Sequence, residues 1–199
     1  MPTRLHVAPR VWNRRQVLIA GGALVAAWPG LSAPVSAMFR KHLAVDGYPF
    51  AIGVASGDPT PDGFVLWTRL APQPLTGGGM PSESVEVRWK VCHDEAMTRV
   101  AAEGTAIATP ELAHSVHVEV PGLEADRWYF YQFAALGEVS PKGRARTAPK
   151  FADMPHQLRM AFASCQHFES GYYNAYEHML REDLDLVAHL GDYIYEYAG

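Results

Sequence analysis

Cysteine is scarce in this sequence, which limits how its fold can be stabilised. Cys92 and Cys165 are the two cysteines among 199 residues, so the chain can form at most one disulfide bond. A disulfide-dense scaffold is excluded, and the fold must depend on buried apolar surface, for which the length and the 48% of hydrophobic residues suffice. The ordinary proportions of glycine, proline and charge also exclude a collagen-like or disordered chain.

Basic residues are scarce after residue 37. The first 37 residues contain four arginines and no acidic residue. Removing these four from the 17 basic residues leaves 13 against 21 acidic residues, a formal charge of −8 for the remainder. Such an acidic body matches the phosphate backbone of nucleic acids poorly, so we expect no nucleic-acid-binding groove. Any anionic ligand would need a local positive centre.

No long apolar run is present that would form a stable membrane-spanning helix. The apolar segment 17–28 is too short to cross a bilayer. Arg14 and Arg15 lie just before it, as in a twin-arginine export signal, and a small-x-small cleavage site follows at 35–37. We predict that residues 1–37 are a twin-arginine signal peptide read by the twin-arginine translocation machinery. The protein would be periplasmic or secreted, with no permanent membrane anchor; a Sec signal or an N-terminal anchor is the alternative.

Residues 45–150 contain short alternating segments separated by turn residues. Four segments that combine alternation with aromatic or β-branched residues are predicted strands: 64–68, 85–91, 115–120 and 128–133. Clusters of glycine and proline separate the strands: 57–59, 72–74, 77–79 and 121–122. This spacing predicts a β-sandwich of the immunoglobulin or fibronectin type III kind. The stretch from Pro121 to Tyr131 resembles the E to F corner of a fibronectin type III domain, where a tyrosine closes the sandwich.

Few residues of the predicted sandwich suggest chemistry. Cys92 is expected to be a small buried apolar residue. Three isolated histidines have no second metal ligand at a matching spacing and are expected at the surface or as hydrogen-bonded core groups: His93, His114 and His117. Residues 143–147 are the last predicted strand of this part. Arg144 and Arg146 alternate on it, and a solvated sheet edge is favoured there over a phosphate contact.

The pattern changes again in residues 156–199. A strand buried on both faces, an amphipathic helix and a second strand are predicted for 158–163, 172–182 and 184–190, respectively. The helix would place four residues on one face: Tyr172, Tyr176, Met179 and Leu180. Strand, helix and strand make a βαβ unit with a parallel strand pair. Because ligands gather beyond the carboxyl ends of such strands, Cys165 and Asp192 should meet there.

Cys165, Asp192 and Tyr195 are candidate metal ligands. A thiolate, a carboxylate and a phenolate are all anionic, and this donor set favours ferric iron over magnesium. Two metals held about 3.5–4 Å apart are a common device for activating water and clamping a phosphoryl group. Each residue alone also has a structural interpretation, as a buried cysteine, a turn aspartate and a core tyrosine. Their common position at the strand ends favours the metal site.

Several motifs resemble a known family. Gly191-Asp192 followed by Tyr195 matches the second signature of the metallophosphatases, in the form seen in purple acid phosphatases. Four segments are similar to the PhoD-like alkaline phosphatase D family: 50–59, 65–70, 162–166 and 191–196. The resemblance implies an exported phosphodiesterase and phosphomonoesterase that hydrolyses phosphate esters through a metal-activated hydroxide, with Fe3+ and Ca2+ as cofactors. It further implies that Cys165 and Tyr195 bind iron and that Asp192 bridges the two metals.

The expected fold is mixed, with a fibronectin III/Ig-like β-sandwich followed by the first βαβ unit of an α/β metallophosphatase domain. Common metallophosphatases have Asp-x-His where this chain has Cys165-Gln166-His167, so His167 is interpreted as a structural group behind the ligands. The later Gly-Asn-His segment is not reached by Gly199, and residues 156–199 are therefore expected to be an incomplete catalytic domain that is inactive alone. The alternative is an exported β-sandwich that binds or adheres without catalysis.

Overall fold

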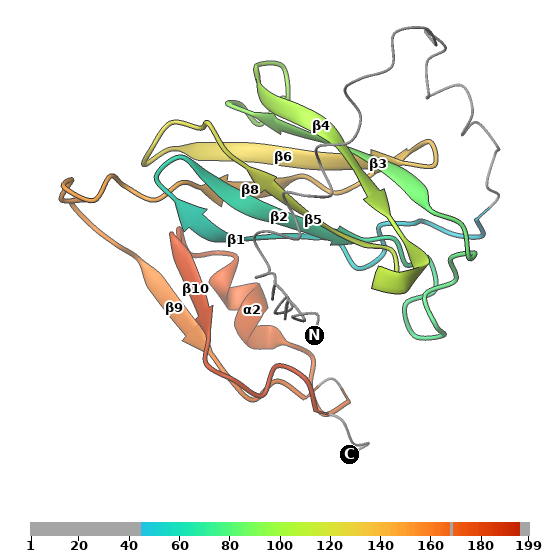
Figure 1. Ribbon diagram of the computed structural model, residues 1–199. Helices are drawn as coiled ribbons and strands as arrows, with labels where there is room; N and C mark the ends of the chain where they lie inside the picture. The colour runs from blue at the N-terminus through green and yellow to red at the C-terminus, as the bar shows by residue number, and fades with distance from the viewer. Residues whose placement is uncertain (1–44, 168, 196–199) are drawn as a thin grey trace, which may run out of the picture. The chain divides into compact units, whose positions relative to one another are not determined.

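The structure, a computed structural model, describes residues 45–167 and 169–195, so the predicted leader 1–37 lies outside the described residues. Within these ranges the chain is mostly β-sheet with little helix (Figure 1). The elements follow in the order β1 (Val54–Thr60), β2 (Gly63–Arg69), β3 (Val85–Cys92), β4 (Val100–Ala108), the 3-10 helix η2 (Pro110–Leu112), β5 (Ser115–Val120), β6 (Trp128–Ala135), β7 (Glu138–Val139), β8 (Gly143–Arg146), β9 (Met160–Ala163), α2 (Asn174–Met179) and β10 (Leu186–His189).

Two sheets form the larger, N-terminal part of the described chain. One has the strand order β1-β2-β5, and the other has the order β4-β3-β6-β7, with β8 also paired to β6. The strand pairs within both sheets are antiparallel. Buried side chains of the two sheets share one core, which includes Phe64, Leu66, Val118, Val87, Tyr129 and Phe133. This arrangement agrees with the predicted β-sandwich in residues 45–150.

Alternation of side chains explains how the sandwich strands bury one face. Valines at every second position of β5 and bulky residues at every second position of β6 are buried: Val116, Val118, Val120, Tyr129, Tyr131 and Phe133. Successive side chains of a strand point to opposite faces, so this spacing sends one set to the core. The hydroxyl of Tyr129 accepts a hydrogen bond from the backbone N–H of Glu124 at 2.9 Å. A tyrosine thus closes the corner between β5 and β6, as the sequence resemblance predicts.

β1 and β4, like the two-residue β7, lie where the sequence pattern predicts no strand. β1 continues through Gly57-Asp58-Pro59, a segment expected to interrupt strands, and its pairing with β2 shifts register between Gly57 and Thr60. A bulge of this kind accommodates residues that fit a regular ladder poorly. β4 is rich in alanine and glycine, yet it pairs with β3 along its length. Gly104 lies opposite Trp89 in this pairing, and a Cβ atom added to Gly104 would lie 2.6 Å from the Trp89 ring. Glycine is therefore the residue that leaves room for this side chain of β3.

The predictions for isolated residues of the sandwich have mixed outcomes. Cys92 is fully buried and His117 is exposed, as expected. His114 is buried, and its Nε2 donates to the carbonyl oxygen of Glu83 at 2.9 Å. His93 differs, because its ring lies 5.3 Å from that of Tyr129 and its buried Nδ1 has no hydrogen-bond partner.

The expectation of a solvated edge holds for Arg144 of β8, which is exposed, and is wrong for Arg146 of the same strand. Arg146 forms ion pairs with Asp126 and Asp185, and its side chain is 25% exposed. The guanidinium of Arg144 lies 4.1 Å from the centre of the Trp128 ring. Carboxylates and an aromatic face supplied by other segments therefore contact these two side chains, which the sequence of the strand alone does not show.

In the C-terminal part, β9 and β10 pair in parallel, from Met160 opposite Leu186 to Ala163 opposite His189, with α2 between them in the chain (Figure 1). The predicted burial of both faces of the first strand is wrong, since Phe162 is 67% exposed. Among the described residues this sheet has two strands, too few to bury both faces.

The helix before β10 is shorter than the predicted 172–182. Tyr172 and Leu180, expected on its apolar face, lie outside it and are 93% and 85% exposed. The residue before the helix, Tyr173, has a left-handed backbone conformation with φ 54°, which ends the helical path there. No described helix has the length and apolar character needed to cross a membrane.

Candidate metal centre

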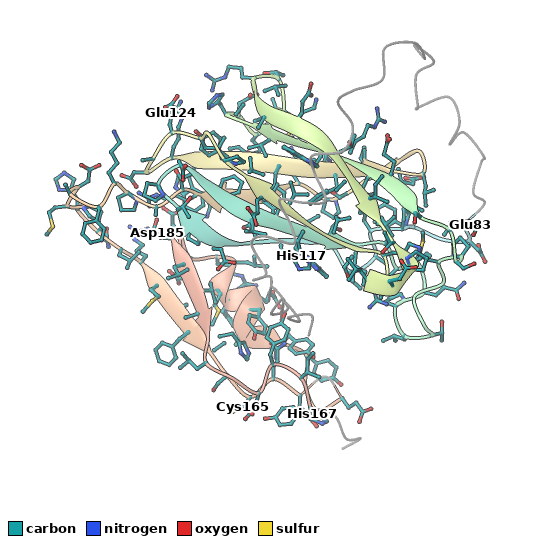
Figure 2. All side chains as sticks on the ribbon, viewed as in Figure 1. Glu83, His117, Glu124, Cys165, His167 and Asp185 are labelled. Atoms are coloured by element: carbon teal, nitrogen blue, oxygen red, sulfur yellow. The ribbon has the colours of Figure 1, made fainter. Side chains whose placement is uncertain are left out.

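The segments that follow β9 and β10 run side by side at the carboxyl ends of these strands. The backbone N–H of Cys165 donates to the carbonyl of Gly191 at 3.1 Å, and that of Gln166 donates to the carbonyl of Asp192 at 3.2 Å. Figure 2 shows Cys165 and His167 beyond this end of the strand pair, with Asp185 at the opposite end of β10. Parallel pairing thus brings together residues that are 27 positions apart in the sequence.

Three potential metal donors meet at this end. One carboxylate oxygen of Asp192, Oδ2, lies 3.3 Å from the Cys165 Sγ and 3.2 Å from the Tyr195 hydroxyl, both of which donate to it. Cys165 and Asp192 are exposed, and Tyr195 is half-buried. The carboxylate is the common partner of the other two groups, and a cation that displaced their protons would meet a thiolate, a carboxylate and a phenolate.

The backbone around these donors is in an uncommon conformation. Cys165 has φ 57° and Asp192 has φ 50°, the left-handed region that residues with a side chain rarely adopt, and Gly191 between the strand and Asp192 has φ 131°. Such conformations cost about 1–3 kcal/mol each and cluster at functional sites. The turn after each strand therefore carries a strained residue, and in both turns that residue is a candidate ligand.

Without a cation the Tyr195 phenol is held in its protonated form. Desolvation, followed by the hydrogen bonds with Cys165 and Asp192 and by the negative charges of these neighbours, raises the pKa of Tyr195 to about 12. A carboxylate beside a phenol disfavours a second negative charge, whereas a bound cation reverses this effect. The phenolate form thus depends on a positive charge in the site.

A cavity of about 200 Å³ adjoins the donors, and its lining includes His167, Tyr193 and Tyr195. The His167 ring lies 5.2 Å from that of Tyr195, and its Nδ1 is 2.7 Å from the hydroxyl oxygen of Ser170. This position behind Tyr195 agrees with the interpretation of His167 as a structural group. The cavity gives a small ligand access to the side of the site that carries Tyr195.

The donor set fits ferric iron better than calcium. Among the residues that the structure describes, no three His, Cys, Asp or Glu side chains are grouped to hold a metal ion, so Tyr195 would be needed as the third donor. Thiolate and phenolate together suit a highly charged transition metal. Calcium takes about six to eight oxygen ligands. The single carboxylate of Asp192 does not meet that need, and we derive no role for calcium here.

Two side chains that support this site were not identified from the sequence. Gln166 and Tyr176 are hydrogen-bonded to each other, and the Gln166 side-chain amide donates to the carbonyl of Tyr193 at 3.3 Å. The position of Gln166 next to Cys165 was a signal of its importance. The position of Tyr176 on a predicted helix face gave no information on its hydroxyl partner.

Comparisons with known proteins agree with the sequence resemblance. Residues 36–149 match the model of the PhoD-like phosphatase N-terminal domain, and residues 160–199 match the model of the PhoD-like phosphatase. Alkaline phosphatase D of Bacillus subtilis (strain 168) is 49% identical over 189 residues, which are 94% of this chain and 32% of that protein. A solved structure of PhoD is 55% identical with a TM-score of 0.76, over 78% of this chain and 30% of that one. The chain thus spans about a third of the length of these relatives, and it belongs to the PhoD-like phosphatase family.

Proposed function

We propose that the protein containing this chain is a phosphoric ester hydrolase of the alkaline phosphatase D type, acting on phosphate monoesters or diesters. The observation that carries the proposal is the shared hydrogen-bonding of Cys165 and Tyr195 to one oxygen of Asp192 at the ends of two parallel strands. The similarity to alkaline phosphatase D supports the same activity. Residues 45–150 would be the N-terminal β-sandwich, and residues 156–199 would begin the metallophosphatase domain, with β9, α2 and β10 as its first βαβ unit.

Cys165, Asp192 and Tyr195 are the proposed ligands of a ferric ion. When bound, such an ion supplies a Lewis-acid centre that polarises a phosphoryl oxygen and lowers the pKa of water. The residues of this chain prepare the site before binding. Asp192 holds the thiol and the phenol in place through one oxygen, and both groups would have to lose their protons to serve as ligands of a cation.

The proposal also includes export of the protein from the cytoplasm. The paired Arg14 and Arg15 before a short apolar segment support a twin-arginine signal in residues 1–37. A protein exported in its folded form acquires its metal inside the cell, where the supply of metals is controlled. The hydrolysis of phosphate esters would then take place in the periplasm or outside the cell.

The test combines metal analysis with a chromogenic phosphodiester assay on protein produced from the whole reading frame that contains this sequence. We expect bound iron and hydrolysis, both lost in Asp192→Asn and strongly reduced in Cys165→Ser. Asp153→Asn is the matched control, because Asp153 is exposed and its backbone N–H, which the substitution keeps, donates to the carbonyl of Lys150. A full-length protein with neither iron nor hydrolysis would contradict the proposal and favour an exported binding module.

A further inference from the structure

We infer that Gln166 is a positioning residue which, together with Tyr176, fixes the separation of Cys165 and Asp192. The consequence for iron binding rests on the proposed function, whereas the mechanical role of this pair does not. The pair is called the Gln166–Tyr176 clamp below. Its hydrogen bonds join the two side chains to each other and to the Tyr193 carbonyl, so it acts through the backbone that carries the donors.

The clamp connects three segments of the chain. The Tyr176 hydroxyl of α2 donates to the Gln166 Oε1, and the Gln166 Nε2 donates to the carbonyl of Tyr193 at 3.3 Å. Gln166 directly follows Cys165, and Tyr193 directly follows Asp192. One side-chain amide therefore joins the turn after β9 to the turn after β10 and ties both to the helix between them.

Only an amide satisfies this arrangement. The Tyr193 carbonyl needs a donor, and the Tyr176 hydroxyl needs an acceptor; glutamine supplies both from one group. A glutamate would keep the acceptor and lose the donor, and a methionine of similar length would lose both. Gln166 and Tyr176 are half-buried, so competition from water for these bonds is reduced.

The clamp adds to a small set of other hydrogen bonds that hold the two turns together. Among the described residues, the Cys165 Sγ donates to the Asp192 Oδ2 at 3.3 Å. Backbone hydrogen bonds near the donors also join the two segments: Leu190 N–H to Ala163, at 2.8 Å, Cys165 N–H to Gly191, at 3.1 Å, and Gln166 N–H to Asp192, at 3.2 Å. Cys165 and Asp192 are also in left-handed conformations, which favour relaxation to other backbone states. Of the two clamp bonds, the one from Gln166 to the Tyr193 carbonyl joins the same two turns, and the one from Tyr176 ties them to α2.

The mechanical role is tested by hydrogen exchange in the metal-free chain. In Tyr176→Phe and Gln166→Met, the backbone amides of Cys165 and Gln166 should exchange about fivefold faster, the effect expected for one net hydrogen bond. Gln166→Glu should lie between Gln166→Met and the native chain, because it keeps the acceptor for Tyr176. Adding Tyr176→Phe to Gln166→Met should change nothing further, since the two residues act as one unit.

The matched control is Tyr172→Phe, which removes the same atom from a tyrosine that is 93% exposed and lies four residues earlier. It should leave both amides unchanged. Amides of the sandwich strand β5 report global stability and should exchange at the native rate in every variant. Native exchange at Cys165 and Gln166 in the clamp variants, or an equal acceleration in β5, would overturn the positioning role.

The consequence for the metal is tested with Fe3+ alone, by competition with a chelator and by the visible charge-transfer absorption of thiolate and phenolate ligands. Tyr176→Phe and Gln166→Met should weaken Fe3+ binding about fivefold and shift this absorption, with Gln166→Glu partly restoring it. Faster exchange in the variants, together with an absence of Fe3+ binding by protein produced from the whole reading frame, would sustain the clamp and contradict the proposed function. Native Fe3+ affinity and an unshifted absorption in both variants would contradict the role of the clamp toward the metal.

Discussion

Arg146 on β8 forms an ion pair with Asp185, the residue that directly precedes β10. Asp185 also accepts the backbone N–H of Arg159, just before β9, at 2.9 Å. The Asp185 side chain is 15% exposed. One carboxylate therefore ties the beginnings of both C-terminal strands to the sandwich, at the end opposite to the candidate metal ligands.

The first prediction concerns the pH dependence of this tie. The hydrogen bond from the Arg159 backbone, and then the charge and hydrogen bond of Arg146, lower the pKa of Asp185. A lowered pKa means that the carboxylate stabilises the folded state above its ordinary pKa of about 3.9 and that this contribution is lost as the pH falls through the folded-state value. Asp185→Asn should lower the free energy of unfolding by about 1–2 kcal/mol at pH 7. The difference from the native chain should shrink at pH 3, as measured by urea unfolding.

Asp183→Asn is the control for that experiment. Asp183 lies two residues earlier and contacts Arg144 at 3.6 Å and Arg159 at 3.3 Å, but it is 69% exposed. An exposed pair of this kind contributes about 0–1 kcal/mol, so the variant should unfold nearly as the native chain does at both pH values. Equal losses in the two variants would contradict the role given to Asp185.

The second prediction concerns the tyrosine that closes the β5–β6 corner. Tyr129→Phe keeps the buried ring and removes the acceptor of the Glu124 N–H, so it should reduce the free energy of unfolding by about 1–2 kcal/mol. Denaturant titration followed by far-UV circular dichroism measures this loss. Tyr172→Phe, at an exposed position, should have no effect. An unchanged midpoint in Tyr129→Phe would show that water replaces the hydroxyl at no cost.

The third prediction tests the packing of Gly143 on β8. This residue is paired with Tyr131 on β6, and an added Cβ would lie 2.1 Å from the tyrosine ring. Tyr131 is buried and cannot move freely, so Gly143→Ala should cost about 1–3 kcal/mol and lower the melting temperature. Gly57→Ala on β1 is the control, because an added Cβ there meets no atom within 4 Å. Equal melting temperatures for the two variants would contradict this packing.

The fourth prediction concerns metal preference. Cys165→Asp replaces the only sulfur of the proposed donor set with a carboxylate. Soft thiolate ligands favour Zn2+, whereas carboxylates suit Mn2+. Titration with each ion should show a lower affinity for Zn2+ and a higher affinity for Mn2+ in the variant. A Zn2+ affinity that is unchanged would mean that Cys165 does not bind the ion.

The sandwich was largely predictable because its strands follow a period of two. Tyr129, Tyr131 and Phe133 alternate in the sequence, and the same residues are buried in the structure. β4 was not predictable. Its Gly104 leaves room for the Trp89 ring of the neighbouring strand, and the sequence around Gly104 does not indicate that contact. The exposure of β9 was not predictable for a similar reason. Its apolar sequence predicts burial, but burial depends on which other elements pack against the strand.

The meeting of Cys165 with Asp192 could be predicted, since both follow strands that the pattern made parallel neighbours. The bond of Tyr176 to Gln166 could not. It depends on how α2 is rotated about its axis, and the helix is shorter than its periodicity suggested, from Asn174 to Met179. Residues that act through a third segment leave no spacing signal in the sequence.

The left-handed backbone conformations of Cys165 and Asp192 lower the stability of the folded chain at two positions that the proposed function requires. Glycine adopts such a conformation without strain, so glycine at either position would stabilise the folded chain while removing a proposed ligand. A variant library selected only for heat resistance should therefore enrich glycine at positions 165 and 192, and one selected for metal uptake should reject it. Positions at which these two selections disagree would mark the metal centre without any knowledge of the substrate.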